Sequence, residues 1–457
     1  MQPIKSLASS YRDNDGFVFE QAGEIHRLVK PSYFSHYNLL VSSGLYKNLV
    51  DAGRLVSHKE LDIALFDTSQ IGNCKILLPE QLPFISYPYE WSFSMWKDAA
   101  IVTLKIAAKA LEYGMYLKDA TPFNIQFYTG RPVFIDTLSF EKMDDGKPWI
   151  AYKQFCECFL APLLLMHYGH RDMGKLFMAY PNGIAMDMLK NMLPLRSRLS
   201  LQVYMHVYMQ ANEKADNKKL NSETNFSKKN FELLLKGLLD MVNGLTLKIT
   251  KSTWNNYYQE TILGNNYLQE KKLLVKLFAD KININKLIDL GANDGAFSLL
   301  LQNNAKHIVA VDADVNCVNE LYNCLRKEKI KNIVPIFAAL NTPSAAIGWN
   351  NTERESLITR LKADTVLALA LVHHLVIGAN VPLQLIATWL QAMGENLIIE
   401  FIPKSDEKVI LLLQNREDIF DDYTLENFKN IFAQYYIFTS EEKVGTTNRV
   451  LFLMQRK

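Results

Sequence analysis

The chain has few cysteines and no long apolar run. Five cysteines occur among 457 residues, and no two have C-x-x-C spacing: Cys74, Cys156, Cys158, Cys317 and Cys324. The pair Cys156 and Cys158 is closer together than the ligands of a structural zinc site, so we expect reduced thiols and no metal centre. No stretch reaches the roughly 18 uncharged apolar residues that a membrane-spanning helix needs. These absences argue against a disulfide framework, a zinc site and a membrane span.

The chain also lacks an excess of either charge. Lysine plus arginine number 50 against 48 acids, for a net charge of +2. Such a balance provides no general positive field for a nucleic-acid backbone, so we expect no nucleic-acid partner. The first sixteen residues contain no apolar signal core, which predicts a cytoplasmic protein. Hydrophobic residues make up 49% of the chain, enough for more than one core.

The pattern along the chain changes twice and predicts three regions. Residues 1–92 form a strand-rich lobe, whose clearest signal is a hairpin over 16–29 around the turn at 21–23. Residues 93–250 are mainly helical and begin with an amphipathic helix at 95–115. Residues 251–457 alternate short apolar runs with helical segments. Within the helical region, the charged stretch 211–230 is expected to be an exposed loop.

Five short apolar runs organise the last region. They read KLIDLG, HIVAVDAD, NIVPIFAAL, DTVLALAL and ENLIIEF, and helical segments separate them. Buried strands that alternate with helices are typical of a parallel, doubly wound α/β sheet. We therefore predict a Rossmann-like sheet for the C-terminal half and an α+β fold for the N-terminal half.

A glycine turn follows the first of these strands. The turn runs Gly291, Ala292, Asn293, Asp294, Gly295, and Asp289 ends the strand before it. Open α/β sheets bind ligands at this carboxyl edge, and glycine lets the backbone approach a ligand closely. Asparagine occupies the place where a dinucleotide-binding turn has its middle glycine. The acids of the turn would repel a pyrophosphate and attract an ammonium group.

A further acid lies at the end of the second strand. Asp312 follows Gly291 by 21 residues, where a carboxylate can accept both hydroxyls of a ribose. Asp314 is expected to cap the helix that begins at Val315. A ligand with an ammonium group, a ribose and no phosphate fits this set, and S-adenosylmethionine (SAM) has all three properties.

The pattern Asp289-x-Gly291-x-Asn293-x-Gly295, followed by Asp312, resembles the first two motifs of class I SAM-dependent methyltransferases. The resemblance covers about residues 253–457, and the segment 435–457 is similar to the antiparallel closing hairpin of that fold. More narrowly, the stretches LNTPSAAIGWNNTERESLITR and LALVHHL resemble a bacterial group of nodulation NoeA-like methyltransferases, whose long N-terminal region is shared too.

The resemblance implies which residues hold SAM. Asp289, Gly291, Asn293 and Gly295 would hold its methionine end, and Asp312 its ribose. The third motif departs from the family pattern, because alanines stand at 338 and 339 where an acid or amide is usual. Asn341 is then the nearest polar candidate for the adenine.

Three further residues are candidates for catalysis. His373 and His374 follow the fourth strand, and one of them would deprotonate or orient the acceptor. Alternatively, one histidine lines the cleft and the other bonds to backbone. Glu400 ends the fifth strand, where it would either contact substrate or cap a turn.

The N-terminal half carries a separate motif. Asp119 and Asn124 form D-x-x-x-x-N, a short hairpin follows, and Asp136 comes next. This order resembles the catalytic loop of protein kinases and aminoglycoside phosphotransferases, which implies a kinase-like fold and an Mg-ATP site formed by the three residues. The glycine-rich loop and the strand lysine of kinases are missing.

Two alternatives therefore stay open beside SAM-dependent methyl transfer. The N-terminal half would be an Mg-ATP-dependent phosphotransferase, or a non-catalytic scaffold that presents a carrier-bound substrate. In the scaffold alternative, Asp119 caps a turn and Asp136 satisfies a loop. The expected methyl acceptor is a small molecule or a glycan-related compound.

Overall fold

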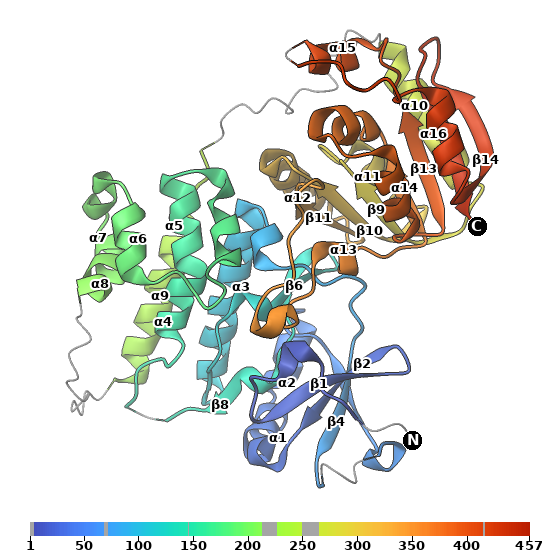
Figure 1. The fold of residues 1–457 in the computed structure, drawn as a ribbon. Helices are drawn as coiled ribbons and strands as arrows, with labels where there is room; N and C mark the ends of the chain where they lie inside the picture. Colours follow the sequence, from blue (N-terminus) through green and yellow to red (C-terminus); the bar gives the residue numbers. More distant parts are fainter. Residues whose placement is uncertain (1–3, 68–71, 145, 213–225, 249–264, 415) are drawn as a thin grey trace. The chain divides into compact units, whose positions relative to one another are not determined.

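The computed structural model describes residues 4–67, 72–144, 146–212, 226–248, 265–414 and 416–457. The chain divides into two compact units (Figure 1). Unit 1 comprises Met1–Lys248 together with Ala346–Glu355, and unit 2 comprises Ile249–Ala345 and Ser356–Lys457. The short segment Ala346–Glu355 thus belongs to unit 1 although both of its neighbours in sequence belong to unit 2. No sequence pattern predicted this exchange.

Unit 1 begins with a four-stranded antiparallel sheet in the order β1-β2-β4-β3. Its strands are β1 (Gly16–Gln21), β2 (Glu24–Val29), β3 (His58–Leu61) and β4 (Lys75–Pro79). The predicted hairpin is confirmed, with Gln21 paired to Glu24 across a two-residue turn. Ala22 and Gly23 have φ of 53° and 79°, the left-handed conformation that such turns require.

The remainder of unit 1 is mainly helical, as predicted. Its longest helix, α3 (Phe93–Glu112), buries twelve side chains. The segment after α3 forms two short antiparallel pairs, β5 (Met115–Leu117) with β8 (Phe140–Lys142) and β6 (Ile125–Tyr128) with β7 (Arg131–Phe134). The other helices are α1 (Phe34–Ser42), α2 (Leu45–Asp51), α4 (Tyr152–Phe155), α5 (Ala161–Tyr168), α6 (Met186–Met192), α7 (Leu201–Val203), α8 (Gln210–Asn212) and α9 (Lys228–Gly244).

Unit 2 is built on one seven-stranded sheet in the order β11-β10-β9-β12-β13-β15-β14. Its strands are β9 (Ile284–Leu290), β10 (Ala305–Asp312), β11 (Ile333–Phe337), β12 (Thr365–Ala368), β13 (Asn396–Phe401), β14 (Tyr436–Lys443) and β15 (Val450–Arg456). The first five pair in parallel, and β15 and β14 are antiparallel. The predicted doubly wound sheet with an antiparallel closing hairpin is therefore confirmed.

Helices cover both faces of this sheet because alternate strand residues point to opposite sides. Leu451 and Leu453 of β15 share a core cluster with residues of three helices, α10 (Asn265–Ala279), α11 (Ala296–Leu300) and α12 (Val315–Glu328). Phe452, between the two leucines, instead contacts Phe428 of α16 (Leu425–Phe432). The other helices of the unit are α13 (Leu357–Arg360), α14 (Leu383–Gln391) and α15 (Glu407–Leu413).

One sequence prediction falls largely outside the described residues. Most of the charged stretch 211–230 belongs to the ranges that the structure leaves out. In the described part of the chain, no helix has both the length and the apolar character required to cross a bilayer. The five cysteines are free thiols, as predicted.

Candidate functional site

The glycine turn lies where β9 ends and α11 begins. Gly291, Asn293 and Gly295 all have positive φ, at 74°, 51° and 80°. The amides of Gly291 and Ala292 donate to the carbonyl oxygen of Val311 at 2.9 and 3.0 Å, which fixes the turn against β10. A Cβ added to Gly295 would lie 2.5 Å from Leu321 Cδ1. Glycine is therefore needed at 295 for both conformation and space.

Asp312 stands beside this turn, as predicted. One carboxylate oxygen accepts from the amide of Asn293 at 2.7 Å, and the other accepts from the amide of Asp314 at 2.7 Å. Burial raises the pKa of this carboxyl, and the backbone amides oppose the rise. Asp314 caps α12 through the amide of Asn316, which confirms the predicted cap. The two oxygens of Asp312 are thus held in place at the carboxyl edge of the sheet.

Asp289 lies beneath the turn and is only 2% exposed. Its carboxylate accepts from the Ser298 hydroxyl at 2.7 Å, which ties the end of β9 to α11. Burial raises the pKa of Asp289 to about 7. Its predicted contact with the methionine end of SAM stays a prediction. Asn341 is exposed in the loop that follows β11, and its adenine contact is likewise a prediction.

The two histidines lie after β12, at the same edge of the sheet. Their ring centroids are 4.1 Å apart, and His373 is fully buried, with no hydrogen-bond partner for either ring nitrogen among the described residues. Burial lowers the pKa of His374 to about 4, and burial lowers the pKa of His373 well below its ordinary value. Both imidazoles are therefore neutral near pH 7, which suits them to accept a hydrogen bond.

Glu400 does not face solvent, because its side chain is fully buried in β13. Its carboxylate accepts from Lys271 Nζ at 2.6 Å, from the Tyr267 hydroxyl at 2.9 Å and from the amide of Ala370 at 2.9 Å. Burial would raise the pKa of Glu400, but the charges of Lys271 and Arg449 outweigh it and hold the pKa below its usual value. Glu400 thus joins α10 to the end of β12.

The same network extends to Arg449, the residue that precedes β15. Arg449 donates to the Tyr267 hydroxyl at 2.7 Å and pairs with both carboxylate oxygens of Asp406. The sequence pattern indicated Glu400, but not Lys271 and Tyr267, which bond to it, nor Arg449, which bonds to Tyr267. A lysine among the apolar positions of an amphipathic helix was the available signal for Lys271.

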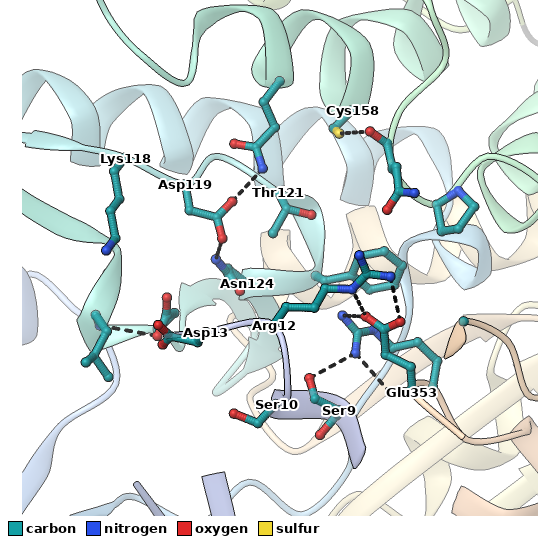
Figure 2. A pocket seen from close by; sticks show the side chains of 18 of the residues that line it. Ser9, Ser10, Arg12, Asp13, Lys118, Asp119, Thr121, Asn124, Cys158 and Glu353 are labelled. Atoms are coloured by element: carbon teal, nitrogen blue, oxygen red, sulfur yellow. Dashed lines mark hydrogen bonds and ion pairs between the residues drawn. The ribbon is translucent and has the colours of Figure 1, made fainter. Parts of the chain in front are cut away.

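In unit 1 the predicted triad lines a single pocket of about 650 Å³. Asn124 donates to the Asp119 carboxylate at 3.2 Å and to the Ser139 hydroxyl at 3.3 Å. The Ser139 hydroxyl in turn donates to Asp136. Figure 2 shows Asp119 and Asn124 facing each other in this pocket. The prediction that the three residues share one site is therefore consistent with the geometry.

The acids of this triad already have partners in the protein. Arg27 binds the Asp136 carboxylate at 2.6 Å, and the amide of Leu138 donates to the same group at 3.2 Å. Gln154 donates to Asp119 at 2.6 Å. Across the described residues, no group of three acids, histidines or cysteines is arranged to hold a metal ion. An Mg-ATP site here stays a prediction, and magnesium would first have to displace Arg27 from Asp136.

The histidine environment predicts acid sensitivity of unit 2. The pKa of His374 is about 4 in the folded state against 6.5 for an ordinary histidine, so the unfolded chain binds more protons between these values. Stability should be full above pH 6.5 and fall toward pH 4, by roughly 2 kcal/mol between pH 7 and about pH 5 from this residue. Hydrogen exchange of β9 and β12 peptides at both pH values measures the loss.

A His374→Asn variant provides the comparison. It should lose less stability than the wild type on the same acid shift, because the substituted side chain takes up no proton. Equal losses in the two proteins would contradict the burial of a neutral His374.

The chain is similar in sequence to one curated protein. It is 32% identical to the nodulation protein NoeA of Rhizobium meliloti (strain 1021) over an alignment 462 positions long, which covers 98% of this chain and 96% of the relative. No protein-family profile matches.

Among solved structures the likeness is weak. The N-methyltransferase NodS from Bradyrhizobium japonicum WM9 has 11% identity and a TM-score of 0.30, covering 42% of this chain and 97% of that protein. The bifunctional kinase-methyltransferase WbdD has 14% identity and a TM-score of 0.29, covering 42% of this chain and 38% of that protein. At these scores neither structure says anything about the ligands of this chain.

Proposed function

The chain belongs to the family of the nodulation protein NoeA, and we propose that its C-terminal unit catalyses SAM-dependent methyl transfer as a class I methyltransferase. The proposed acceptor is a small-molecule, carrier-bound or glycan-related compound. The observation that carries the proposal is the pairing of the glycine turn with Asp312 at the carboxyl edge of a sheet ordered β11-β10-β9-β12-β13-β15-β14.

The residues present fit SAM in two respects. Gly291 and Gly295 both have positive φ, which shapes the turn at the edge of the sheet, and a Cβ at Gly291 would meet Leu371 only at 3.6 Å, so the backbone there leaves room for a methionine moiety. The Asp312 carboxylate is already oriented by two amides and keeps capacity to accept ribose hydroxyls, because a carboxylate has about four acceptor positions. No phosphate-binding residue is needed for such a ligand.

SAM supplies a methyl group on a cationic sulfur, which is already activated for transfer. The chain must then bind the acceptor, align it and exclude water. His373 and His374 are neutral, so they suit hydrogen bonding to an acceptor O–H or N–H better than removal of a proton in advance. In this proposal the buried Glu400 network holds the loop before the histidines in place and does not touch the substrate.

Calorimetry with SAM tests the proposal directly. The full chain is expected to bind SAM, and Asp312→Ala should weaken binding at least tenfold because the ribose loses charge-assisted hydrogen bonds. Asp421→Asn, an exposed aspartate of the same unit, is the matched control and should bind like the wild type. Failure of the wild type to bind SAM, or equal binding by Asp312→Ala, would contradict the proposed site.

A further inference from the structure

The pocket of unit 1 is lined largely by polar side chains, and their arrangement indicates which kind of ligand it suits. Its volume of about 650 Å³ lies within the usual range for small-ligand sites. The lining includes the segment before β1, the loop around Asp119, Arg27 of β2, Asp136 and the segment Ala346–Glu355. Carboxylates, amides, hydroxyls and cationic groups all contribute, so the pocket offers both donors and acceptors.

Each cationic side chain of the pocket is already paired with an acid. Arg27 binds Asp136 at 2.6 Å, and Lys118 binds Asp15 at 2.9 Å. Arg12 makes two hydrogen bonds to Glu353, at 2.7 and 3.0 Å, and Figure 2 shows this pair in the pocket. Arg354 also lies 3.7 Å from Glu353. A phosphate would have to compete with a carboxylate for every one of these cations.

The acids of the pocket oppose an anionic ligand as well. Burial raises the pKa of Asp119, and the negative charge of Asp136 raises it further. Burial also raises the pKa of Asp13, which lies near Asp136 and Arg27. A bound phosphate would add negative charge to a place where carboxylates already repel one another.

Asp119 is held as a hydrogen-bond acceptor. Gln154 and Asn124 donate to its two oxygens, and Gln154 is itself fixed by the amide of Ala120 at 2.7 Å. Each carboxylate oxygen can accept more than one hydrogen bond, so Asp119 keeps capacity for a ligand hydroxyl. The amides of Gln154 and Asn124 fix its direction, as a site for hydroxyl groups requires.

The lining lacks a place for a flat purine base. Phe123 is the sole aromatic side chain among the described residues that line the pocket. The Arg354 guanidinium covers its ring at 4.4 Å from the centroid. A nucleotide base normally stacks between apolar or aromatic surfaces, and here that surface is already covered.

We propose that this pocket binds a neutral carbohydrate, whose hydroxyls donate to Asp119 and accept from the side-chain amides around it, since each amide NH2 group has two donors. A ligand with hydroxyls and no net charge leaves the ion pairs of the pocket intact, whereas an anion would compete for them. The site is independent of the proposed methyl transfer, because SAM binding at Asp312 can succeed or fail whatever this pocket binds.

The segment Ala346–Glu355 gives the pocket a direct covalent link to the sequence of unit 2. Glu353 is 7% exposed and holds Arg12, and the amide of Glu355 donates to the Tyr87 hydroxyl at 3.1 Å. These contacts fix the segment in unit 1, so a carbohydrate in the pocket should protect it. Protection of this segment is therefore a readout that needs no mutation.

The test screens the full-length protein against an array of neutral and anionic oligosaccharides, with Mg-ATP and inorganic phosphate titrated separately. The strongest neutral glycan is then measured by calorimetry. We expect binding that falls at least tenfold in Asp119→Asn and is unchanged in Asp240→Asn, an exposed aspartate of α9. Hydrogen exchange of wild-type peptides covering 9–15 and 346–355 should slow when that glycan binds.

Three outcomes would overturn the proposal. Absence of binding to any neutral glycan overturns the proposal. So does glycan binding that leaves both peptides unprotected, or protection of them by Mg-ATP or phosphate in place of a glycan. Because the exchange measurement uses the wild type, a folding defect in Asp119→Asn does not remove the test.

Discussion

A Glu400→Gln variant is expected to destabilise unit 2 by about 3 kcal/mol, because it leaves Lys271 without a counter-ion in the interior. Lys271 and Glu400 are 1% and 0% exposed, and their charged atoms are 2.6 Å apart. Water cannot replace the lost carboxylate at that depth. Hydrogen exchange of β9, β12 and β13 peptides in the full-length chain reports the change in the free energy of unfolding.

A matched glutamate and a double variant make this result specific. Glu395, which precedes β13 and is 70% exposed, should tolerate Glu395→Gln with almost no change. Lys271→Met combined with Glu400→Gln should recover most of the lost stability, since the unpaired charge is gone. Equal stabilities of Glu400→Gln and Glu395→Gln would show that the buried pair does not hold these elements together.

Glu400→Gln should also weaken SAM binding, with or without the Lys271→Met substitution. Glu400 also accepts from the amide of Ala370, which has a φ of 50° at the end of β12. A non-glycine residue in that conformation needs support from its surroundings. The double variant should therefore recover stability more completely than it recovers SAM affinity.

A Gly295→Ala variant is expected to destabilise unit 2 by about 2 kcal/mol, through crowding and a disfavoured backbone conformation together. The new Cβ would lie 2.5 Å from Leu321 Cδ1, at a φ of 80°. Relieving this crowding would displace the turn, including the Asn293 amide that donates to Asp312, so SAM affinity should fall too. Urea unfolding and calorimetry measure the two effects on one protein preparation.

Gly378 provides the control within the same unit. A Cβ added there meets nothing within 4 Å, and the residue has no positive φ. Gly378→Ala should therefore leave stability and SAM affinity close to those of the wild type. If Gly295→Ala behaves like Gly378→Ala, the turn is not constrained as the structure indicates.

Local patterns were sufficient to predict the elements of the fold. The hairpin of β1 and β2 follows from two apolar runs around a two-residue turn that takes left-handed φ. The five parallel strands follow from buried apolar runs separated by helical segments. Each signal depends on residues that are close in sequence, and for that reason it can be read from the sequence.

The site was only partly predictable for a related reason. The glycine turn and Asp312 lie at the ends of neighbouring strands, so the topology brings them together once the sheet is recognised. Spacing alone could not show that Asp289 lies beneath the turn, that Glu400 is fully buried, or that Arg27 binds Asp136. Those facts depend on which side chains the packing brings into contact.

The sequence by itself determined the doubly wound sheet, the α+β character of the N-terminal half and the position of the glycine turn. The tertiary structure decided the partners: Lys271 meets Glu400 across 129 residues, and Arg12 meets Glu353 across 341 residues. It also placed Ala346–Glu355 in unit 1. Elements arise from local periodicity and turn chemistry, whereas charge pairs between distant residues arise only when folding brings their segments together.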